Sequence, residues 1–349
     1  MSTALKSNTT RSQAVPLWSW KANHMKAIVY YKCGSPEVLR CEEIEKPVPN
    51  DDEVLIKVRA ASVNPLDWRL MRGGPYIVRI LFGLGKPKLK RPGVDVAGQV
   101  EAVGSNVTRF KPGDAVFGMC KGAFAECGCA SESAFVIKPD NVTFEQAASV
   151  PVAALTALQG LRDQGHTQPG QKVLINGAAG GVGTFTVQIA KWFGAEVTGV
   201  CSTRNAEMIR SIGADHVIEY TQEDFTKGQL RYDLIFDCVG NHSLSAYRRV
   251  LNPNGICVMI GGKEMWSILT RLIQALALSR LVSQKFVFFI AKSSKADLAI
   301  MQELMASGKL RPVIDRCYSL SEVPEAIQYL EQGHARGKVV ITLESANKT

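Results

Sequence analysis

Neither a C-x-x-C pair nor a long apolar segment near the N-terminus occurs in this chain of 349 residues. The nine cysteines are odd in number, scattered and mostly inside apolar stretches, which favours reduced thiols in a cytosol-like compartment over a disulfide framework. Only Cys120, Cys127 and Cys129 are close enough to be tested as a metal site. Because no fourth Cys or His is near them, we interpret them as thiols packed within strands.

The first 24 residues lack acidic side chains and are rich in Ser and Thr. They contain no apolar core of signal-peptide length, so we do not expect secretion. Transit peptides and disordered tails both have this composition. We favour a disordered extension over residues 1–24, a folded part that starts at Met25, and a cytoplasmic location.

The composition is that of an ordinary globular protein, with 46% apolar and 21% charged residues. The length favours two domains that share a cleft. The net charge of +9 suits an anionic ligand such as a cofactor phosphate. It is also compatible with weak attraction to nucleic acid or a membrane surface; we interpret it as a solvated basic surface and expect no nucleic-acid partner.

A glycine-rich turn at residues 177–183, G-A-A-G-G-V-G, follows a short β-branched run and precedes apolar residues at helical spacing. Strand, turn and helix in this order form the first unit of a dinucleotide-binding fold. Small residues let the backbone approach a pyrophosphate, and the N–H groups at the helix start face its charge. We interpret the fingerprint as A-x-G-x-x-G, with Ala178 in place of the first glycine, then Gly180 and Gly183.

The segment after the second expected strand, residues 196–200, concerns the choice of cofactor. NAD-preferring sites place Asp or Glu about 20 residues beyond the glycines, where it binds the ribose 2′-OH. Here that position is Ser202, and from Ser202 onward no acid occurs before Glu207. Because a hydroxyl and a guanidinium can bind a 2′-phosphate, Ser202 and Arg204 predict NADPH. The alternative is that Arg204 only begins an exposed helix.

The other segments alternate between β and helical patterns. Short β segments with Gly and Pro turns indicate a compact, partly barrel-like β domain, at residues 27–31, 38–44, 53–61, 95–103, 114–119, 122–124 and 134–137. Further strands are expected at residues 213–220, 232–239 and 256–260, and helices at residues 153–161, 206–212 and 295–307. His216 and His242 have no partner that the sequence identifies.

Together with the glycine turn, three further segments resemble those of a known family. They are R-P-G-V-D-V-A-G-Q-V-E-A-V-G, F-K-P-G-D-A-V-F-G and G-A-F-A-E. From Met25 to about Leu343 the chain resembles the zinc-independent quinone oxidoreductase branch of the medium-chain dehydrogenase/reductase superfamily. The resemblance implies an α/β fold of two domains. A GroES-like β-barrel catalytic domain would span residues 25–152 and 293–349, and a Rossmann domain with a doubly wound parallel sheet would span residues 153–292.

The zinc-dependent alcohol dehydrogenases, which the chain also resembles, take their catalytic ligands from three segments. The corresponding positions here hold Asn64, Val94 and Val152, none of which can serve as a zinc ligand, and the lobe of four cysteines is missing. We therefore expect no metal. Without a Lewis acid, quinones and α,β-unsaturated carbonyls, which accept hydride, are more suitable substrates than alcohols or ketones.

The resemblance also implies which residues bind the cofactor. It places Asn64 and Thr156 beside the nicotinamide and Tyr220 at the adenosine phosphate end. The remaining predicted cofactor residues belong to the turn, to strand ends and to the last strand: Ala179, Gly180, Gly181, Val182, Gly183, Val239, Gly261 and Lys338. A turn-shaping role for Asn64, a packing role for Thr156 and a surface position for Lys338 are the alternatives.

Asn64 and Tyr76 are the predicted catalytic residues. The Asn64 amide would hold the carboxamide or the substrate oxygen. Tyr76 would donate a proton, although solvent can also do so, and capping or packing roles stay open for Tyr76 and Asp67. Residues 77–91 are interpreted as a lid, or else as a membrane-surface element.

The sequence thus predicts an NADPH-dependent oxidoreductase that transfers hydride to small hydrophobic acceptors, quinones or α,β-unsaturated carbonyls, without metal. The alternatives are a 2-enoyl thioester reductase, an NADP-linked alcohol dehydrogenase, or a non-catalytic NADPH-binding regulator. Residues 267–290 predict an amphipathic helix that is buried in a homodimer, with peripheral membrane contact as the second interpretation.

Overall fold

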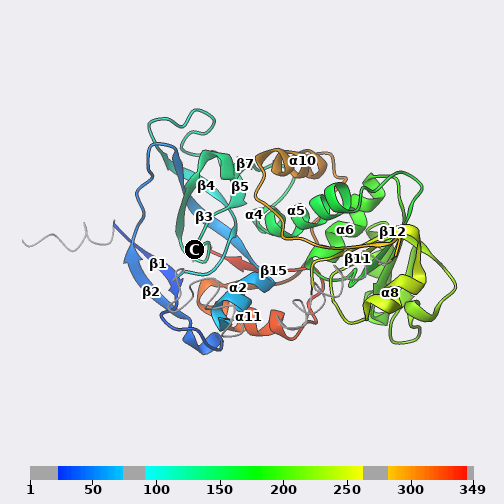
Figure 1. Ribbon diagram of the computed structural model, residues 1–349. Helices are drawn as coiled ribbons and strands as arrows, with labels where there is room; N and C mark the ends of the chain where they lie inside the picture. The colour runs from blue at the N-terminus through cyan, green and yellow to red at the C-terminus, as the bar shows by residue number, and fades with distance from the viewer. Residues whose placement is uncertain (1–22, 74–90, 262–281, 344–349) are drawn as a thin grey trace, which may run out of the picture.

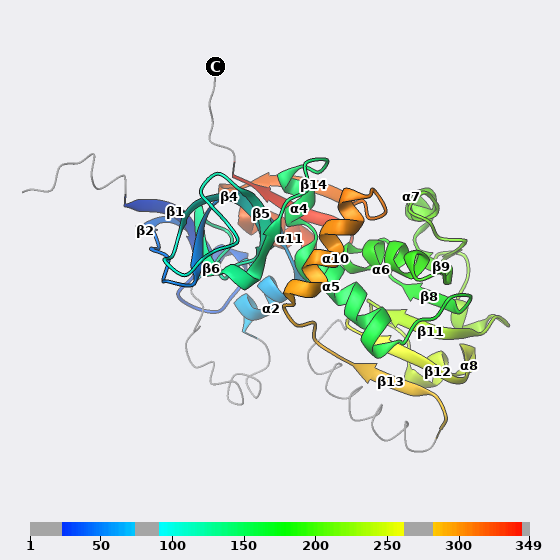
Figure 2. The same ribbon diagram turned by 90° about the horizontal axis from the view of Figure 1, so that it is seen from above.

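A computed structural model describes residues 23–73, 91–261 and 282–343. In this part of the chain the strands form sheets of two, six and seven strands. Figures 1 and 2 show an elongated molecule in which the mainly antiparallel strands lie at one end and the parallel sheet at the other. The predicted residues 1–22 of the tail and 77–90 of the lid lie outside the described residues.

The seven-stranded sheet belongs to the barrel-like part and has the order β14-β15-β3-β4-β5-β7, with β6 also paired to β3. A separate antiparallel hairpin joins β1 to β2. The strands are β1 (His24–Val29), β2 (Arg40–Glu45), β3 (Glu53–Val63), β4 (Asp95–Val103), β5 (Ala115–Met119), β6 (Cys127–Ser131), β7 (Phe135–Ile137), β14 (Ile314–Ser319) and β15 (Lys338–Thr342).

The final strand β15 pairs antiparallel with β3, with Val339 opposite Val63. The last strand of the described chain and a strand from its first quarter are therefore neighbours in the barrel. This register places Lys338 next to Asn64, which directly follows β3 and precedes helix α2 (Pro65–Arg72). Helices α4 (Phe144–Ala148) and α11 (Val323–Glu331) also pack on this sheet.

The six-stranded sheet is parallel throughout and has the order β10-β9-β8-β11-β12-β13. Its strands are β8 (Lys172–Asn176), β9 (Glu196–Cys201), β10 (His216–Glu219), β11 (Tyr232–Asp237), β12 (Leu251–Met259) and β13 (Lys285–Phe288). Its helices are α5 (Pro151–Gln159), α6 (Gly181–Trp192), α7 (Ala206–Ser211), α8 (Leu244–Val250) and α10 (Lys295–Ala306). The strand order reverses between β8 and β11, and ligands bind at such a switch point, beyond the carboxyl ends of the strands.

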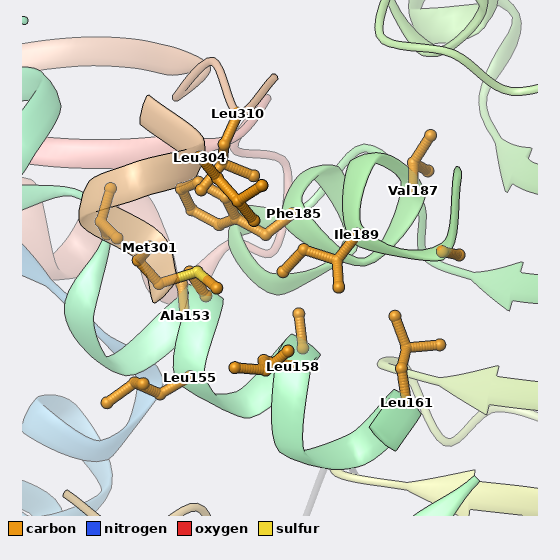
Figure 3. Packing of buried hydrophobic residues seen from close by; sticks show 14 of the residues in the cluster. Ala153, Leu155, Leu158, Leu161, Phe185, Val187, Ile189, Met301, Leu304 and Leu310 are labelled. Carbon is orange, nitrogen blue, oxygen red and sulfur yellow. The ribbon is translucent and has the colours of Figure 1, made fainter. Parts of the chain in front are cut away.

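One cluster of buried apolar residues spans both parts. Figure 3 shows Phe185 and Ile189 of α6 facing Leu158 of α5 and Leu304 of α10, all of them buried. The same cluster includes Phe117 of β5 and residues of β3 and β15. The cofactor-binding sheet is therefore held against the barrel by packing and not only by chain connections.

Two sequence-based elements are wrong. Residues 122–124 form a turn instead of a strand, because Gly122 has a φ of +78° and its N–H donates to the carbonyl oxygen of Gly93. The expected helix over residues 267–290 does not extend to its end, since residues 285–288 form β13; aromatic and β-branched residues there favour a strand. The segment 267–281 lies outside the described residues. No described helix has the length and apolar character needed to cross a bilayer.

Candidate functional site

Three glycines of the turn after β8, Gly177, Gly180 and Gly183, have different structural roles. Gly177 has a φ of +84°, and a Cβ there would lie 2.6 Å from the side chain of Val239. A Cβ on Gly183 would lie 2.1 Å from the carbonyl oxygen of Gly177. The tight turn is thus made by Gly177 and not at Ala178, which is buried with its methyl group near Gly199.

Gly180 leaves open space in front of helix α6. A Cβ on Gly180 would have no heavy-atom neighbour closer than 3.5 Å, and the first turn of α6 contains no acidic residue. The first N–H groups of a helix lack partners within the helix and attract anions. Ala179, Gly181 and Val182 flank this space, so the turn fits the pyrophosphate of a dinucleotide.

The segment that leads into β15 lies along the glycine turn. The N–H of Gly337 donates to the carbonyl oxygen of Ala179 at 2.8 Å, and Gly337 forms an isolated parallel bridge with Gly180. A guanidinium nitrogen of Arg204 donates to the carbonyl oxygen of His334 at 2.9 Å. The structure therefore brings the turn, Arg204 and the loop before β15 together.

A buried polar group lies behind this contact; it comprises Ser62, Asn64, Asp67, Asp95 and Lys338 and is called the Lys338 cluster below. Lys338 is 3% exposed, so the surface position that the sequence left open is wrong. Its ammonium donates to Asn64 Oδ1 at 2.6 Å and lies 3.5 Å from Asp95 Oδ2. The pairing of β15 with β3 directs this side chain inward.

Asp95 joins the members of the Lys338 cluster. Its Oδ2 accepts hydrogen bonds from Ser62 Oγ and Asn64 Nδ2, both at 2.9 Å, and its Oδ1 accepts from the backbone N–H of Val152 at 2.9 Å. With Lys338 this makes four donors, which matches the capacity of an ionised carboxylate. Sequence reasoning missed Asp95, although it lies in the G-V-D segment, because only the fold shows what it contacts.

The two residues predicted beside the nicotinamide already have partners in the protein. Both ends of the Asn64 amide bind within the Lys338 cluster, and Asn64 is 4% exposed. The Thr156 hydroxyl donates to the carbonyl oxygen of Val152, one turn earlier in α5. Asp95 connects Asn64 with Val152, so Asn64 and Thr156 lie on one wall. Tyr76, the other predicted catalytic residue, lies outside the described residues.

The residues at the three zinc-ligand positions do not fit a metal ion. Val94 and Val152 carry hydrocarbon side chains, and the oxygen of Asn64 accepts from the Lys338 ammonium. An ammonium beside these positions repels a cation. Among residues 23–73, 91–261 and 282–343, no three His, Cys, Asp or Glu side chains are grouped to hold a metal.

Burial changes the acid–base properties of the Lys338 cluster. Loss of solvent raises the pKa of Asp67 to about 7, and Asp95 adds to this effect, whereas the N–H groups of Asn64 and Gly93 and the charge of Lys338 oppose it. Burial also lowers the pKa of Lys338, against the opposing effect of the two carboxylates. The cluster thus contains a carboxyl that titrates near neutral pH.

The predicted residues at the adenosine end lie around the end of β9. Ser202 Oγ accepts from Asn205 Nδ2 at 3.2 Å, and Tyr220 is 59% exposed just beyond β10. Among the described buried side chains, the oxygen of Asn205 has no hydrogen-bond partner. A buried acceptor of this kind fits a ligand hydroxyl, as on a ribose.

The predicted residues at the ends of β11 and β12 are close to the glycine turn. Val239 lies against Gly177, and a Cβ on Gly261 would lie 2.1 Å from the carbonyl oxygen of Cys238. Asp237, which sequence reasoning missed, is fully buried and accepts from Asn176 and from the N–H groups of Val239 and Gly240. This carboxylate fixes the loop that faces the turn.

The two histidines singled out in the sequence have partners after all. His216 Nε2 lies 3.2 Å from Glu196 Oε1 on the neighbouring strand. The ring of His242 packs edge-on against Phe225 and Tyr247. These contacts join residues of different strands, helices and loops, which explains why the sequence did not reveal them.

Two family models match the chain: zinc-binding dehydrogenase over residues 212–341 and alcohol dehydrogenase GroES-like domain over residues 50–159. A chloroplastic quinone-oxidoreductase of Triphysaria versicolor is 34% identical over 91% of this chain and 98% of its own length. The chloroplastic NADPH-dependent alkenal/one oxidoreductase of Arabidopsis thaliana is 33% identical over 96% of this chain and 82% of its own length. The solved quinone oxidoreductase of Coxiella burnetii superposes with a TM-score of 0.80 at 31% identity, covering 92% of this chain and all of that one.

The different tasks of two glycines predict different effects of the same substitution. Gly180→Ala should leave the Tm nearly unchanged but weaken dinucleotide binding about 10-fold or more, because the methyl group enters the open space. Gly183→Ala should lower the Tm by several degrees, because its methyl group would collide with a backbone oxygen. Thermal melting and fluorescence titration measure both; undiminished binding by the Gly180 variant would contradict the assignment of the turn.

Asp67 predicts a pH dependence of stability. Its pKa is about 7 in the folded chain against an ordinary value of 3.8, so its contribution is fully present below pH 4 and is lost as the pH rises through 7. From pH 5 to 8 the free energy of unfolding should fall by about 1–4 kcal/mol from this group, and Asp67→Asn should remove that fall. Urea unfolding at several pH values measures it, with the exposed Asp140→Asn as control. Equal slopes for the wild type and Asp67→Asn would refute the assignment.

Proposed function

Because the chain belongs to the quinone oxidoreductase branch of the medium-chain dehydrogenase/reductase superfamily, we propose that it reduces quinones or α,β-unsaturated carbonyls with NADPH and without a metal. One observation carries the proposal. The glycine turn, with its open space at Gly180, lies next to the buried Lys338 cluster, which lies at the positions where a catalytic zinc would need its ligands. Such a site can bind a nicotinamide dinucleotide but lacks the means to polarise an alcohol through a metal.

The described residues that fit the dinucleotide form a continuous path. The pyrophosphate would lie at the N-terminus of α6, between Gly180 and the loop at Val239, and the adenosine ribose near Asn205. When bound, the nicotinamide supplies the hydride. Asn64 and Thr156 would then lie beside the ring, with Asn64 held in place by Lys338 and Asp95.

The preference for NADPH over NADH rests on the end of β9. Ser202 and Arg204 are at the position where an acid would repel a 2′-phosphate, and Arg204 is exposed. Only one of its nitrogens has a described partner, His334, and a guanidinium carries five N–H donors. A phosphate can therefore be bound with charge-assisted hydrogen bonds while the contact with His334 persists.

A homodimer and a cytoplasmic location stay proposals. Within the described residues β13 is the last strand of the parallel sheet, and an edge strand can pair with a second copy of the chain. Two of the relatives named above are chloroplastic, a location other than the one proposed for this chain. Peripheral membrane contact would be the alternative use of residues 77–90 and 267–281, which lie outside the described residues.

The proposed reaction predicts a ranking of substrates. NADPH oxidation, followed at 340 nm, should be at least about 10-fold higher in kcat/KM with quinones or enones than with saturated ketones or 2-enoyl thioesters. A chelator such as 1,10-phenanthroline should not change the rate, because no ligand set for zinc exists at the three positions. Chelator-sensitive alcohol oxidation with NADP⁺ would contradict the proposal. Tight NADPH binding without turnover of any acceptor would instead favour a regulator.

Arg204 predicts the cofactor preference. Arg204→Glu should lower kcat/KM for NADPH about 100-fold, because it replaces charge-assisted hydrogen bonds with repulsion of the 2′-phosphate. The value for NADH should change little, since NADH carries no such phosphate. Arg248→Glu, an identical charge change on the exposed face of α8, is the matched control. Equal losses for both cofactors would show that Arg204 acts through the fold and not through the phosphate.

A further inference from the structure

The ammonium of Lys338 contacts the first of the three positions that were compared above with zinc ligands, and its partner Asp95 is connected to the other two. At the first position, Asn64 Oδ1 accepts from Lys338 Nζ at 2.6 Å. The second position precedes Asp95, whose Oδ2 lies 3.5 Å from the same nitrogen. At the third, the backbone N–H of Val152 donates to the other oxygen of Asp95. A lysine cation and its carboxylate thus connect the three positions.

The side chain of Lys338 also contacts the glycine turn. A Cβ on Gly181 would lie 3.0 Å from Lys338 Cδ, so the aliphatic part of Lys338 passes directly beside the first residue of α6. The preceding residue, Gly337, is hydrogen-bonded to Ala179. The aliphatic part of Lys338 therefore contacts the glycine turn, and its ammonium contacts Asn64 of the barrel.

We propose that Lys338 is a positioning residue of this reductase, whose buried charge takes the structural place of the metal ion. It holds the Asn64 amide in one orientation and fixes the glycine turn against the barrel, so that cofactor and acceptor are kept at a constant separation. This inference rests on the proposed function. A displacement of about 1 Å between reacting groups is enough to cost about 100-fold in rate.

A charge is needed at this place because Asp95 is fully buried. A buried carboxylate requires a cation or many donors, and its three other donors are neutral groups: Ser62 Oγ, Asn64 Nδ2 and the Val152 N–H. Asp67 adds a second carboxyl to the surroundings of the ammonium. Lys338 supplies the only cation that the described structure places on Asp95.

The test separates the charge of Lys338 from its contribution to folding. Lys338→Met removes the charge at similar length, and Lys338→Met combined with Asp95→Asn removes both charges together. The single variant should melt at a lower temperature, because it leaves Asp95 without its cation, and the double variant should recover much of that loss. In both, kcat should be about 100-fold below the wild type, while the Kd for NADPH changes less than about 5-fold.

Lys138→Met is the control, since Lys138, in the loop after β7, also donates to carbonyl oxygens, those of Pro139 and Val142, through partly buried hydrogen bonds. It should affect the Tm and leave kcat unchanged. Zinc content, measured by atomic absorption, should stay well below one ion per chain in the wild type and in both Lys338 variants.

Three results would overturn the inference. One is a double variant whose kcat returns together with its Tm, because Lys338 would then serve folding alone. Another is a single variant with wild-type kcat. The third is stoichiometric zinc in the wild type. Failure of the wild-type protein to reduce any quinone or enone would instead contradict the proposed function. That result concerns the wild type alone and is distinct from the comparison of variants with wild type.

Discussion

The contact between Lys338 and the pair Asn64 and Asp95 lies where the barrel meets the glycine turn and the start of α5. It joins the last strand of the barrel to β3, β4 and the start of α5, and the stem of Lys338 lies beside the glycine turn. A buried ion pair is not in itself a strong source of stability, because desolvation offsets most of the attraction. Its value here is geometric, since both partners are fixed by several hydrogen bonds.

The glycine turn shows how one motif combines folding and ligand binding. Gly177 permits the backbone to reverse with positive φ, and Gly183 allows α6 to pack against the start of the turn. Gly180 does neither and leaves space for a ligand instead. The buried carboxylate of Asp237 then fixes the opposite side of this space through the N–H groups of Val239 and Gly240.

At the three positions compared with zinc ligands, the described structure has two hydrocarbon side chains and an amide that is engaged by Lys338. A catalytic zinc would supply a positive charge and an open coordination position. The Lys338 cluster supplies a positive charge that is fully engaged with protein groups and has no open position. An acceptor that is already electron-poor requires less polarisation, and orientation becomes the main contribution of the protein.

The sequence by itself determined the α/β class, the glycine turn and most strands, since β4 begins and ends where the pattern of Asp95 to Val103 indicates. These features depend on local periodicity and on residues that are close together in the chain. It failed where local preference was weak or overruled, as at Gly122, whose positive φ makes a turn, and at β13, whose neighbour β12 makes it a strand. Only the tertiary structure decided that Lys338 is buried, that Asp95 joins the cluster and that Gly177 forms the tight turn. Those properties arise from the pairing of β15 with β3 and from the docking of its preceding loop on the glycine turn. No pattern within a single segment encodes such contacts, because they join groups such as Lys338 and Asn64, which are 274 residues apart along the chain.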